Sequence, residues 1–170
     1  EFKEALDMLE SEGIEGLVLD LRDNPGGLLT ESINVAKEIV PEGPITHVVD
    51  GAGDITKTYY SQAEKKPYPI VVLVNEFSAS ASEIVAGALQ DSHGATLVGT
   101  KTFGKATVQN MLELGDDSGL RYTIARYLTP DKRNIDGEGL EPDYLVELPE
   151  IFKAAYHPLT GEPRLGDSGD

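Results

Sequence analysis

The stretch Asn75-Glu76-Phe77-Ser78-Ala79-Ser80-Ala81-Ser82-Glu83-Ile84 joins two segments with different hydrophobic patterns. Before it, residues 69–74 read Pro-Ile-Val-Val-Leu-Val, an apolar run without polar alternation, which predicts a strand buried on both faces. After it, apolar residues recur at helical spacing as far as Asp91. The serine-rich turn is therefore expected to follow a buried strand and to begin a helix.

The serines of this turn allow two interpretations. A serine at the start of a helix lies beside free backbone N–H groups that favour negative charge, which suits an acyl-transfer nucleophile. Ser80 followed by Glu83 also matches a capping box, in which the hydroxyl and the carboxylate accept hydrogen bonds from the first N–H groups of the helix. The local sequence chooses neither between these interpretations nor among Ser78, Ser80 and Ser82.

Length and composition indicate one soluble globular domain. The chain has 170 residues, of which 39% are hydrophobic and 26% charged, enough to bury a core. The net charge of −16 is spread along the chain and disfavours binding to nucleic acid or to an anionic membrane surface. Cysteine is absent, which excludes disulfides, thiolate metal sites and a cysteine nucleophile.

The N-terminus has neither a signal-peptide pattern nor a transmembrane pattern. No apolar run approaches the roughly 20 residues needed to cross a bilayer. Residues 1–9 already show helical spacing, with Phe2, Ala5, Leu6 and Leu9 on one face. We expect the sequence to be a fragment of a longer protein, whose targeting signal would lie outside it.

A second turn repeats the strand, turn, helix order. Leu17–Arg22 is predicted to be a strand and Leu29–Val40 a helix, and Asp23-Asn24-Pro25-Gly26-Gly27 separates them. Its glycines allow the backbone to approach a ligand closely, although a bare turn would look the same. Ligands bind beyond the carboxyl ends of strands in α/β sheets. Both turns are therefore expected to face one crevice.

The rest of the chain predicts further strands. Residues 45–49 and 55–60 form a candidate strand pair, 95–99 a strand, 111–114 and 120–127 a hairpin, and 144–146 an edge strand. Residues 149–156 are predicted to form a short helix. The alternation of helices and strands up to residue 99 predicts an α/β fold with a largely parallel sheet.

Lys105 has small and apolar neighbours, Phe103, Gly104 and Ala106. Such surroundings suit a lysine that loses its proton, although a solvated lysine is the simpler interpretation. Gln109 lies four residues further on, on the same side of the chain as Lys105 in a helix or a strand.

Four motifs together resemble the C-terminal processing, or tail-specific, serine proteases. The resemblance covers the chain to about residue 148, and the motifs occur in the family's order. They are Leu17-Val18-Leu19-Asp20-Leu21-Arg22 with Asn24-Pro25-Gly26-Gly27-Leu28; Asn75 with Ser78-Ala79-Ser80-Ala81-Ser82-Glu83-Ile84; Gly99 with Thr102-Phe103-Gly104-Lys105 and Gln109; and Gly139-Leu140-Glu141-Pro142-Asp143.

The resemblance implies specific roles for residues of these motifs. Ser80 would be the nucleophile and Lys105 its general base. Gln109 would orient the lysine. The backbone N–H groups of Ala81 and Gly26 would form the oxyanion hole. Asp91 matches an acidic position that supports the site in some members of the family.

The resemblance also implies a fold and an activity. The fold would be that of the Clp protease and crotonase superfamily, an α/β domain with a largely parallel sheet, flanking helices and a C-terminal β-hairpin. Residues 1–156 would form the catalytic core, and 157–170 a mobile tail rich in Pro, Gly and Asp. The activity would be that of a serine endopeptidase that cleaves near protein C-termini through an acyl-enzyme, with no metal or cofactor.

Family members usually carry a PDZ domain that captures substrate C-termini, and this sequence lacks that domain. The resemblance implies an extracytoplasmic location, in the periplasm, the cell envelope or outside the cell. It allows a membrane tether outside the printed sequence and a homo-oligomer. Without the capture domain, the 170-residue piece could be inactive.

The Ser-Lys mechanism makes one physical demand. A lysine in water has a pKa of about 10.4 and stays protonated, so a lysine base must be buried enough to lower this by roughly three units. We therefore expect the Lys105 amine to be enclosed.

Three other functions stay open from the sequence. A Ser-His-Asp triad would pair Ser80 with His93 and Asp91, but these lie more than about 15 Å along the helix from the serine turn at a rise of about 1.5 Å per residue. His47 and His157 lie in no recognisable motif. The chain could also be an inactive peptide-binding or assembly module of the same fold, or a crotonase-like acyl-CoA enzyme, which would not need a Ser-Lys pair.

Overall fold

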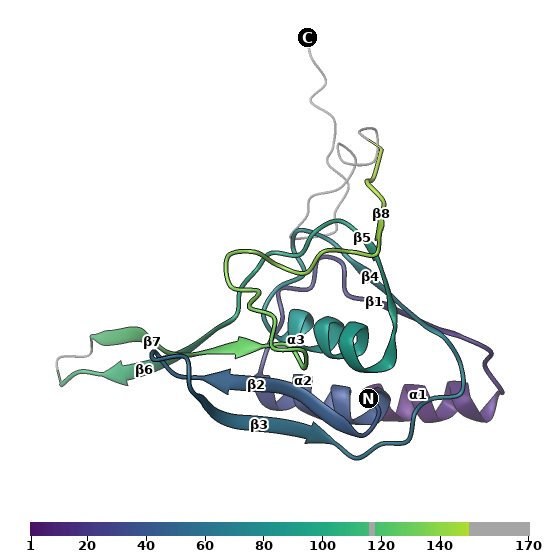
Figure 1. Cartoon of the computed structure of the whole chain (residues 1–170), viewed down its shortest axis with the longest axis horizontal. Coiled ribbons are helices and arrows are strands. Elements are labelled where there is room, and N and C mark those ends of the chain that lie inside the picture. The colour runs from purple at the N-terminus through teal and green to yellow at the C-terminus, as the bar shows by residue number, and fades with distance from the viewer. Residues whose placement is uncertain (116–117, 150–170) are drawn as a thin grey trace, which may run out of the picture.

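The computed structural model describes residues 1–115 and 118–149, which contain three α-helices, one π-helical turn and eight strands (Figure 1). In chain order these elements are α1 (Phe2–Ser11), β1 (Leu17–Asp20), α2 (Leu29–Ile39), β2 (Gly43–Val49), β3 (Ile55–Ser61), β4 (Ile70–Val74), α3 (Ala81–Ala88), the π-helical turn η1 (Leu89–His93), β5 (Thr96–Gly99), β6 (Thr107–Glu113), β7 (Gly119–Leu128) and β8 (Tyr144–Leu145).

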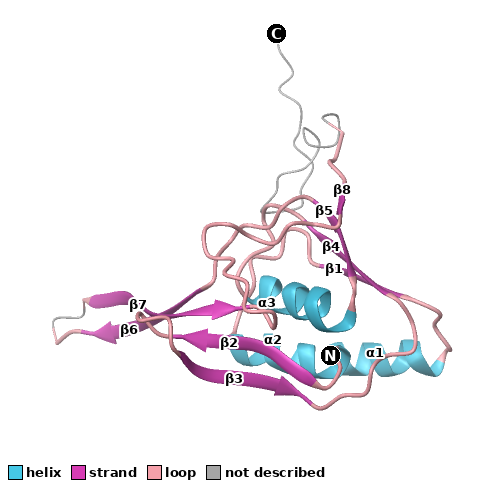
Figure 2. Ribbon diagram, viewed as in Figure 1, coloured by secondary structure: helices cyan, strands magenta, loops and turns pink. Residues whose placement is uncertain are grey.

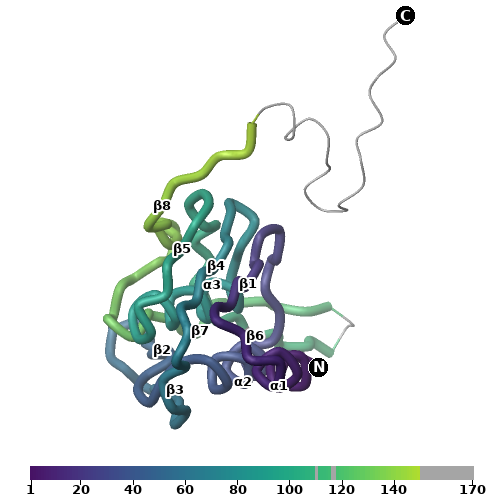
Figure 3. The backbone as a smooth tube through the Cα atoms, turned by 90° about the vertical axis from the view of Figure 1, so that its right-hand side faces the viewer, coloured from purple at the N-terminus to yellow at the C-terminus, as the bar shows by residue number. Residues whose placement is uncertain are grey.

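Strands β1, β4, β5 and β8 form a parallel sheet in the order β1-β4-β5-β8. The tube in Figure 3 shows these strands side by side, with β8 at one edge. The predicted strands at 17–22, 70–74 and 95–99 and the predicted edge strand at 144–146 are all present, as are the helices after the two turns. The α/β class with a parallel sheet is therefore confirmed.

One prediction about β4 was wrong. Its alternate residues Ile70, Val72 and Val74 are buried, but Val71 and Leu73 are only half-buried. In Figure 2, α2 and α3 lie on one side of the parallel sheet. In the described part of the chain no helix covers the other side, so the strand has one fully buried face and not two. A purely apolar run does not reveal this difference.

The predicted strand pair and the predicted hairpin join into a second sheet. Strands β3, β2, β7 and β6 are antiparallel in the order β3-β2-β7-β6, and β2 meets β7 at Val48↔Tyr127. The outer part of the β6–β7 hairpin projects from the body of the protein (Figure 1). The sequence predicted the two strand pairs but not their union, because pairing between distant segments leaves no local pattern.

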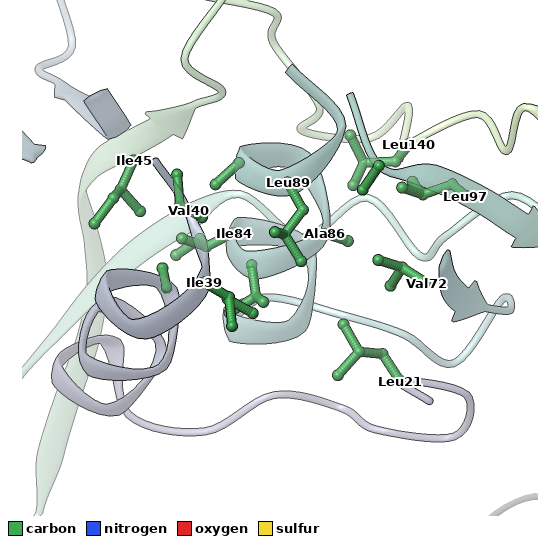
Figure 4. Close-up of a cluster of buried hydrophobic side chains, with 14 of the residues drawn as sticks. Leu21, Ile39, Val40, Ile45, Val72, Ile84, Ala86, Leu89, Leu97 and Leu140 are labelled. Atoms are coloured by element: carbon green, nitrogen blue, oxygen red, sulfur yellow. The ribbon is translucent and has the colours of Figure 1, made fainter. Parts of the chain in front are cut away.

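The core lies between the parallel sheet and the helices. Every residue of α3 is buried, and this helix contacts α2, η1 and β2. Figure 4 shows Ile84 and Ala86 of α3 among Ile39 of α2, Val72 of β4 and Leu97 of β5. Because α3 is enclosed by packing all round, the turn that begins it is held in place by the whole core.

Of the C-terminal predictions, residues 150–170 lie outside the described residues, so the helix expected at 149–156 and the tail at 157–170 stay predictions. Among the described helices, none combines the length and the apolar character that crossing a bilayer requires.

Candidate active site

Ser80 lies at the start of α3 in a backbone conformation that is rare for a residue with a side chain. Its φ is 55° and its ψ is −113°, outside the usual right-handed and extended regions. Such strain persists only where the surroundings enforce it, and it is frequent at functional sites. Two backbone hydrogen bonds from other segments hold this turn in place. Ala79 N–H donates to Asn24 O at 3.1 Å, and Phe103 N–H donates to Ser78 O at 3.0 Å.

The three competing serines have different surroundings. The Ser78 hydroxyl is buried; it donates to Leu21 O at 2.7 Å and accepts from Asn75 N–H at 3.0 Å. Ser82 is buried, at 4% exposure. Ser80 is half-buried and therefore reachable from solvent. Of the three, Ser80 is the best placed to meet a substrate.

The glycine turn after β1 packs directly against the Ser80 turn. Gly26 has φ +94°, and a Cβ added to it would lie 2.6 Å from Ala79 O, 2.7 Å from Ala81 N and 3.1 Å from Ser80 Cβ. No side chain fits there. The Gly26 N–H donates to Asn24 Oδ1 at 2.9 Å, so it is already engaged within its own turn. The two turns thus face one another, as the sequence predicted.

Two hydrogen bonds between Asn75 and Asp23 join the two turns. Asn75 Oδ1 accepts from Asp23 N–H at 2.9 Å, and Asn75 Nδ2 donates to Asp23 Oδ1 at 2.8 Å. Asn75 follows β4 and Asp23 follows β1, so these bonds join the carboxyl ends of two neighbouring parallel strands. In the sequence, Asn75 is recognisable only as part of a motif, and this function was not predicted from it.

Glu83 connects the Ser80 turn to the segment that carries Lys105. Its side chain is completely buried and accepts four hydrogen bonds. Oε2 accepts from the N–H groups of Ser80 at 2.9 Å and Lys105 at 2.8 Å. Oε1 accepts from Gly104 N–H at 2.7 Å and from the Thr102 hydroxyl at 2.5 Å. One carboxylate therefore places the backbones of both predicted catalytic residues side by side.

This role of Glu83 exceeds what its spacing suggested. The capping-box pattern predicted the bond to the Ser80 N–H, and that bond is present. The three bonds to residues 102–105 come from a segment about twenty residues away in sequence. The only sequence signal for them was the presence of Glu83 and the Thr102–Lys105 motif in the same family resemblance.

The Lys105 side chain is exposed, in contrast to the expected enclosed amine. Only its backbone is fixed, by Glu83. Within residues 1–115 and 118–149 no hydrogen bond joins the Lys105 ammonium to the Ser80 hydroxyl. Gly104 and Ala106 are buried on either side, so the small neighbours pack inward while the lysine side chain points outward. The small residues beside Lys105 therefore indicated a closely packed backbone at this position, and not a buried lysine amine.

The two remaining predicted residues lie on β6 and in η1. Gln109 is exposed on β6, beside a register shift between Val108 and Gln109. Asp91 lies in η1, beyond the far end of α3. Its carboxylate is 4% exposed, pairs with the Arg133 guanidinium and accepts from Asp131 N–H at 3.0 Å. Asp91 therefore anchors the loop after β7.

Neither described histidine contacts Ser80. The ring nitrogens of His47 lie 2.8 Å from Thr58 Oγ1 and 3.1 Å from Pro130 O. His93 is buried at the end of η1, and burial together with the charge of Lys65 lowers its pKa. These positions give no support to a Ser-His-Asp triad, while His157 lies outside the described residues. Among residues 1–115 and 118–149, no group of three or more acidic or histidine side chains is placed to hold a metal ion.

The chain is similar in sequence and structure to known processing proteases. The model of peptidase family S41 matches residues 1–146. The carboxyl-terminal-processing protease of Synechocystis sp. is 46% identical over 151 residues, which cover 89% of this chain and 35% of the relative. The chloroplastic carboxyl-terminal-processing peptidase 2 of Arabidopsis thaliana is 44% identical over 152 residues, with coverage of 88% and 29%.

A solved structure is also similar to this chain. The photosystem II D1 C-terminal processing protease superposes with a TM-score of 0.79 at 40% identity, over 85% of this chain and 38% of that chain. The chain thus spans about a third of the length of these relatives. The family model covers far more than half of the chain, and the fold agrees. The chain therefore belongs to peptidase family S41.

Proposed function

We propose that this chain is the catalytic part of a serine endopeptidase that cleaves protein substrates near their C-termini, with Ser80 as nucleophile and Lys105 as general base. The observation that carries the proposal is the strained Ser80 backbone at the start of α3, with Gly26 packed against it. Membership of an S41 peptidase family supports the reaction class, and the names of the relatives support C-terminal processing.

The proposed reaction passes through an acyl-enzyme. Ser80 Oγ attacks the peptide carbonyl carbon while its proton moves to the neutral Lys105 Nζ. The negative oxygen is stabilised by the N–H groups of Ala81 and Gly26, for which Gly26 must share its bond to Asn24 Oδ1 with the oxyanion. The leaving amine takes the proton from Lys105. Water then attacks the acyl carbon, and Ser80 regains its proton.

Lys105 can act as a base only after its amine has turned toward Ser80 and lost contact with water. Its backbone is already fixed beside Ser80 through Glu83, so rotation of the side chain alone is required. A bound substrate, or a part of the full-length gene product beyond these residues, would supply the covering surface. Gln109 would then orient the amine, and Asp91 would support the site indirectly through the loop after β7.

The partners follow from the same proposal. Substrates would be proteins or peptides with an accessible C-terminus, captured by a PDZ domain in the full-length gene product. The location would be extracytoplasmic, with a membrane tether and a homo-oligomer compatible with this arrangement. No cofactor or metal takes part.

The exposed Lys105 supports one alternative, a catalytically inactive peptide-binding or assembly module of the same fold. Cleavage of an unfolded protein by the full-length gene product distinguishes the two. Ser80→Ala should abolish cleavage, whereas Ser82→Ala, its buried neighbour in the same turn, should retain measurable activity. Covalent labelling by a fluorophosphonate should require Ser80. Equal cleavage by the parent and by Ser80→Ala would contradict the proposal.

Lys105→Arg tests the base separately. Arginine keeps the positive charge but does not lose its proton, so cleavage should disappear. For the parent, kcat/KM should rise with pH, because deprotonation creates the active form of the lysine. Near-parent activity of Lys105→Arg would exclude the Ser-Lys mechanism and leave Ser80 with another base.

A further inference from the structure

Asn75 lies directly after β4 and uses its whole side-chain amide in hydrogen bonds. Its Oδ1 accepts from the N–H groups of Asp23 at 2.9 Å and Phe77 at 3.1 Å. Its Nδ2 donates to Asp23 Oδ1 at 2.8 Å. Its backbone N–H donates to Ser78 Oγ at 3.0 Å. One half-buried residue therefore contacts both the glycine turn and the start of the serine turn.

Asp23 needs this support because of its backbone conformation. Its φ is 58°, in the left-handed region that is uncommon for a residue with a side chain. Such a conformation persists only where the surroundings fix it. The next residue, Asn24, places the rest of the turn: its O accepts from Ala79 N–H at 3.1 Å, and its Oδ1 accepts from Gly26 N–H at 2.9 Å. Fixing Asp23 therefore fixes the start of the turn in which the Gly26 N–H lies.

An amide is required at position 75, because the site needs an acceptor for N–H groups and a donor for a carboxylate on the same side chain. A carboxylate there could not donate, and it would face Asp23 Oδ1 at about the distance of the present bond. Among the described residues, Arg22 and Glu76 are the other charged groups that line the small cavity beside Asn75. Both are engaged with other side chains. Asp23 is therefore the charged group that a change at position 75 meets first.

We propose that Asn75 is a positioning residue for the reaction, which holds the Gly26 N–H group in place beside Ser80 through its two bonds to Asp23. These bonds join the carboxyl ends of β1 and β4, which lie side by side in Figure 3. When they are lost, the two turns can shift and the oxyanion loses alignment with one of its donors. The oxyanion forms only during the reaction, so the loss should appear in kcat and not in KM. The inference rests on the proposed function.

The first experiment combines a disruption with its rescue in the full-length gene product. Asn75→Asp should lower kcat for peptide cleavage at least about 100-fold, with KM unchanged within about threefold. Adding Asp23→Asn to this variant puts an amide donor opposite the new carboxylate and should raise kcat again at least about 10-fold. Asp23→Asn alone should cost less than Asn75→Asp, since its amide oxygen can still accept from Asn75 Nδ2.

Asn34→Asp is the control for the same change of charge. Asn34 is exposed on α2, and its variant should keep kcat and KM within about twofold of the parent. In Asn75→Asp two carboxylates face each other, which raises the pKa at which one of them takes a proton and becomes a donor. The kcat of this variant relative to the parent should therefore rise as the pH falls from about 8 to about 6. Simple misfolding would not produce this dependence.

The second experiment does not depend on cleavage. Hydrogen exchange of residues 22–28, followed by mass spectrometry, should be faster in Asn75→Asp than in the parent and should return toward the parent when Asp23→Asn is added. This result supports the positioning role even if no peptidase activity is found, in which case only the proposed function fails.

Unchanged exchange in Asn75→Asp, or a loss of kcat that Asp23→Asn does not restore, overturns the positioning role even if the protein is an active peptidase. If Asn75→Asp alone does not fold, the double variant decides. A folded double variant with the exchange of the parent at residues 22–28 supports the role of Asn75, and an unfolded one overturns it.

Discussion

The Glu83 carboxylate is buried in a protein interior where a charged group is stable only if it is well hydrogen-bonded. Its four donors supply this stabilisation: three backbone N–H groups and the Thr102 hydroxyl. Two of these N–H groups belong to Ser80 and Lys105. The distance between the nucleophile and its predicted base therefore depends on one side chain that takes no part in the reaction itself.

Glu83→Gln should disrupt this arrangement. An amide offers one acceptor oxygen, and its NH₂ group would face N–H groups that also donate. We expect a loss of about 3 kcal/mol in the free energy of unfolding and at least about a 100-fold fall in kcat/KM. Urea unfolding and peptide cleavage measure the two effects.

Glu76→Gln is the control for the same chemical change. Glu76 is exposed and accepts from the Thr100 hydroxyl at 2.8 Å. This variant should behave like the parent in both assays. Parent-like stability and activity of Glu83→Gln would show that the shared carboxylate does not position the site.

At the scale of elements, the site consists of two strand-to-helix turns in contact. The turn between β1 and α2 and the turn between β4 and α3 meet because β1 and β4 are neighbours in a parallel sheet. They are in close contact at Gly26, where an added Cβ would overlap backbone atoms of Ala79 and Ala81. The packing of the two turns, more than any single side chain, therefore forms the candidate oxyanion hole.

Gly26→Ala and Gly27→Ala should differ sharply. At Gly26 the new methyl group meets backbone atoms at 2.6 Å and 2.7 Å, and φ is +94°, so the turns must separate. A shift of about 1 Å at a catalytic site can cost about 100-fold in rate. At Gly27 a Cβ meets nothing within 4 Å, so activity should persist. Peptide cleavage and thermal denaturation of both variants check this. Similar activities in the two would refute the close contact.

The π-helical turn η1 should make stability depend on pH. Burial and Lys65 lower the pKa of His93 below its ordinary value of 6.5. The unfolded chain therefore binds a proton near pH 6.5 that the folded protein does not yet bind, so stability is lost as the pH falls from about 7 toward the lowered pKa. The free energy of unfolding therefore rises with pH in this range, as expected for a base that folding keeps neutral.

His93→Gln removes this titration. The difference in unfolding free energy between the parent and this variant, measured by urea unfolding, should be largest near pH 8 and should shrink toward pH 5. A difference that is constant over this range, or one that grows as the pH falls, would contradict the assignment to His93.

At the scale of the whole molecule, the dominant electrostatic feature is the net charge of −16. Several of the ion pairs in the described chain are exposed, such as Lys3–Asp7 and Lys101–Glu141, and contribute little each. Repulsion among the excess carboxylates acts over longer distances and opposes the compact state. Salt should weaken this repulsion more than it weakens the local pairs.

We therefore expect added salt to stabilise the fold. Between about 10 mM and 150 mM sodium chloride the Debye length falls from about 30 Å to about 8 Å. The Tm should rise by a few degrees over this range, as measured by thermal denaturation at pH 7. A fall in Tm would mean that local ion pairs outweigh the general repulsion.

The sequence by itself determined the order of helices and strands, the two turns at strand ends, and the family. These features depend on neighbouring residues: apolar periodicity locates α1, α2 and α3, and glycine and serine mark the turns. The family motifs combined four such local signals. The pairing of Ser80 with Glu83 was also visible, because three residues are one turn of a helix.

Only the tertiary structure decided which surfaces are covered and which distant groups meet. It showed the half-buried face of β4, the second sheet, the three bonds from residues 102–105 to Glu83, and the exposed side chain of Lys105. The physical reason is common to all four. Burial and long-range hydrogen bonding depend on what packs against a residue from elsewhere in the chain, and the identity of its sequence neighbours does not specify that partner.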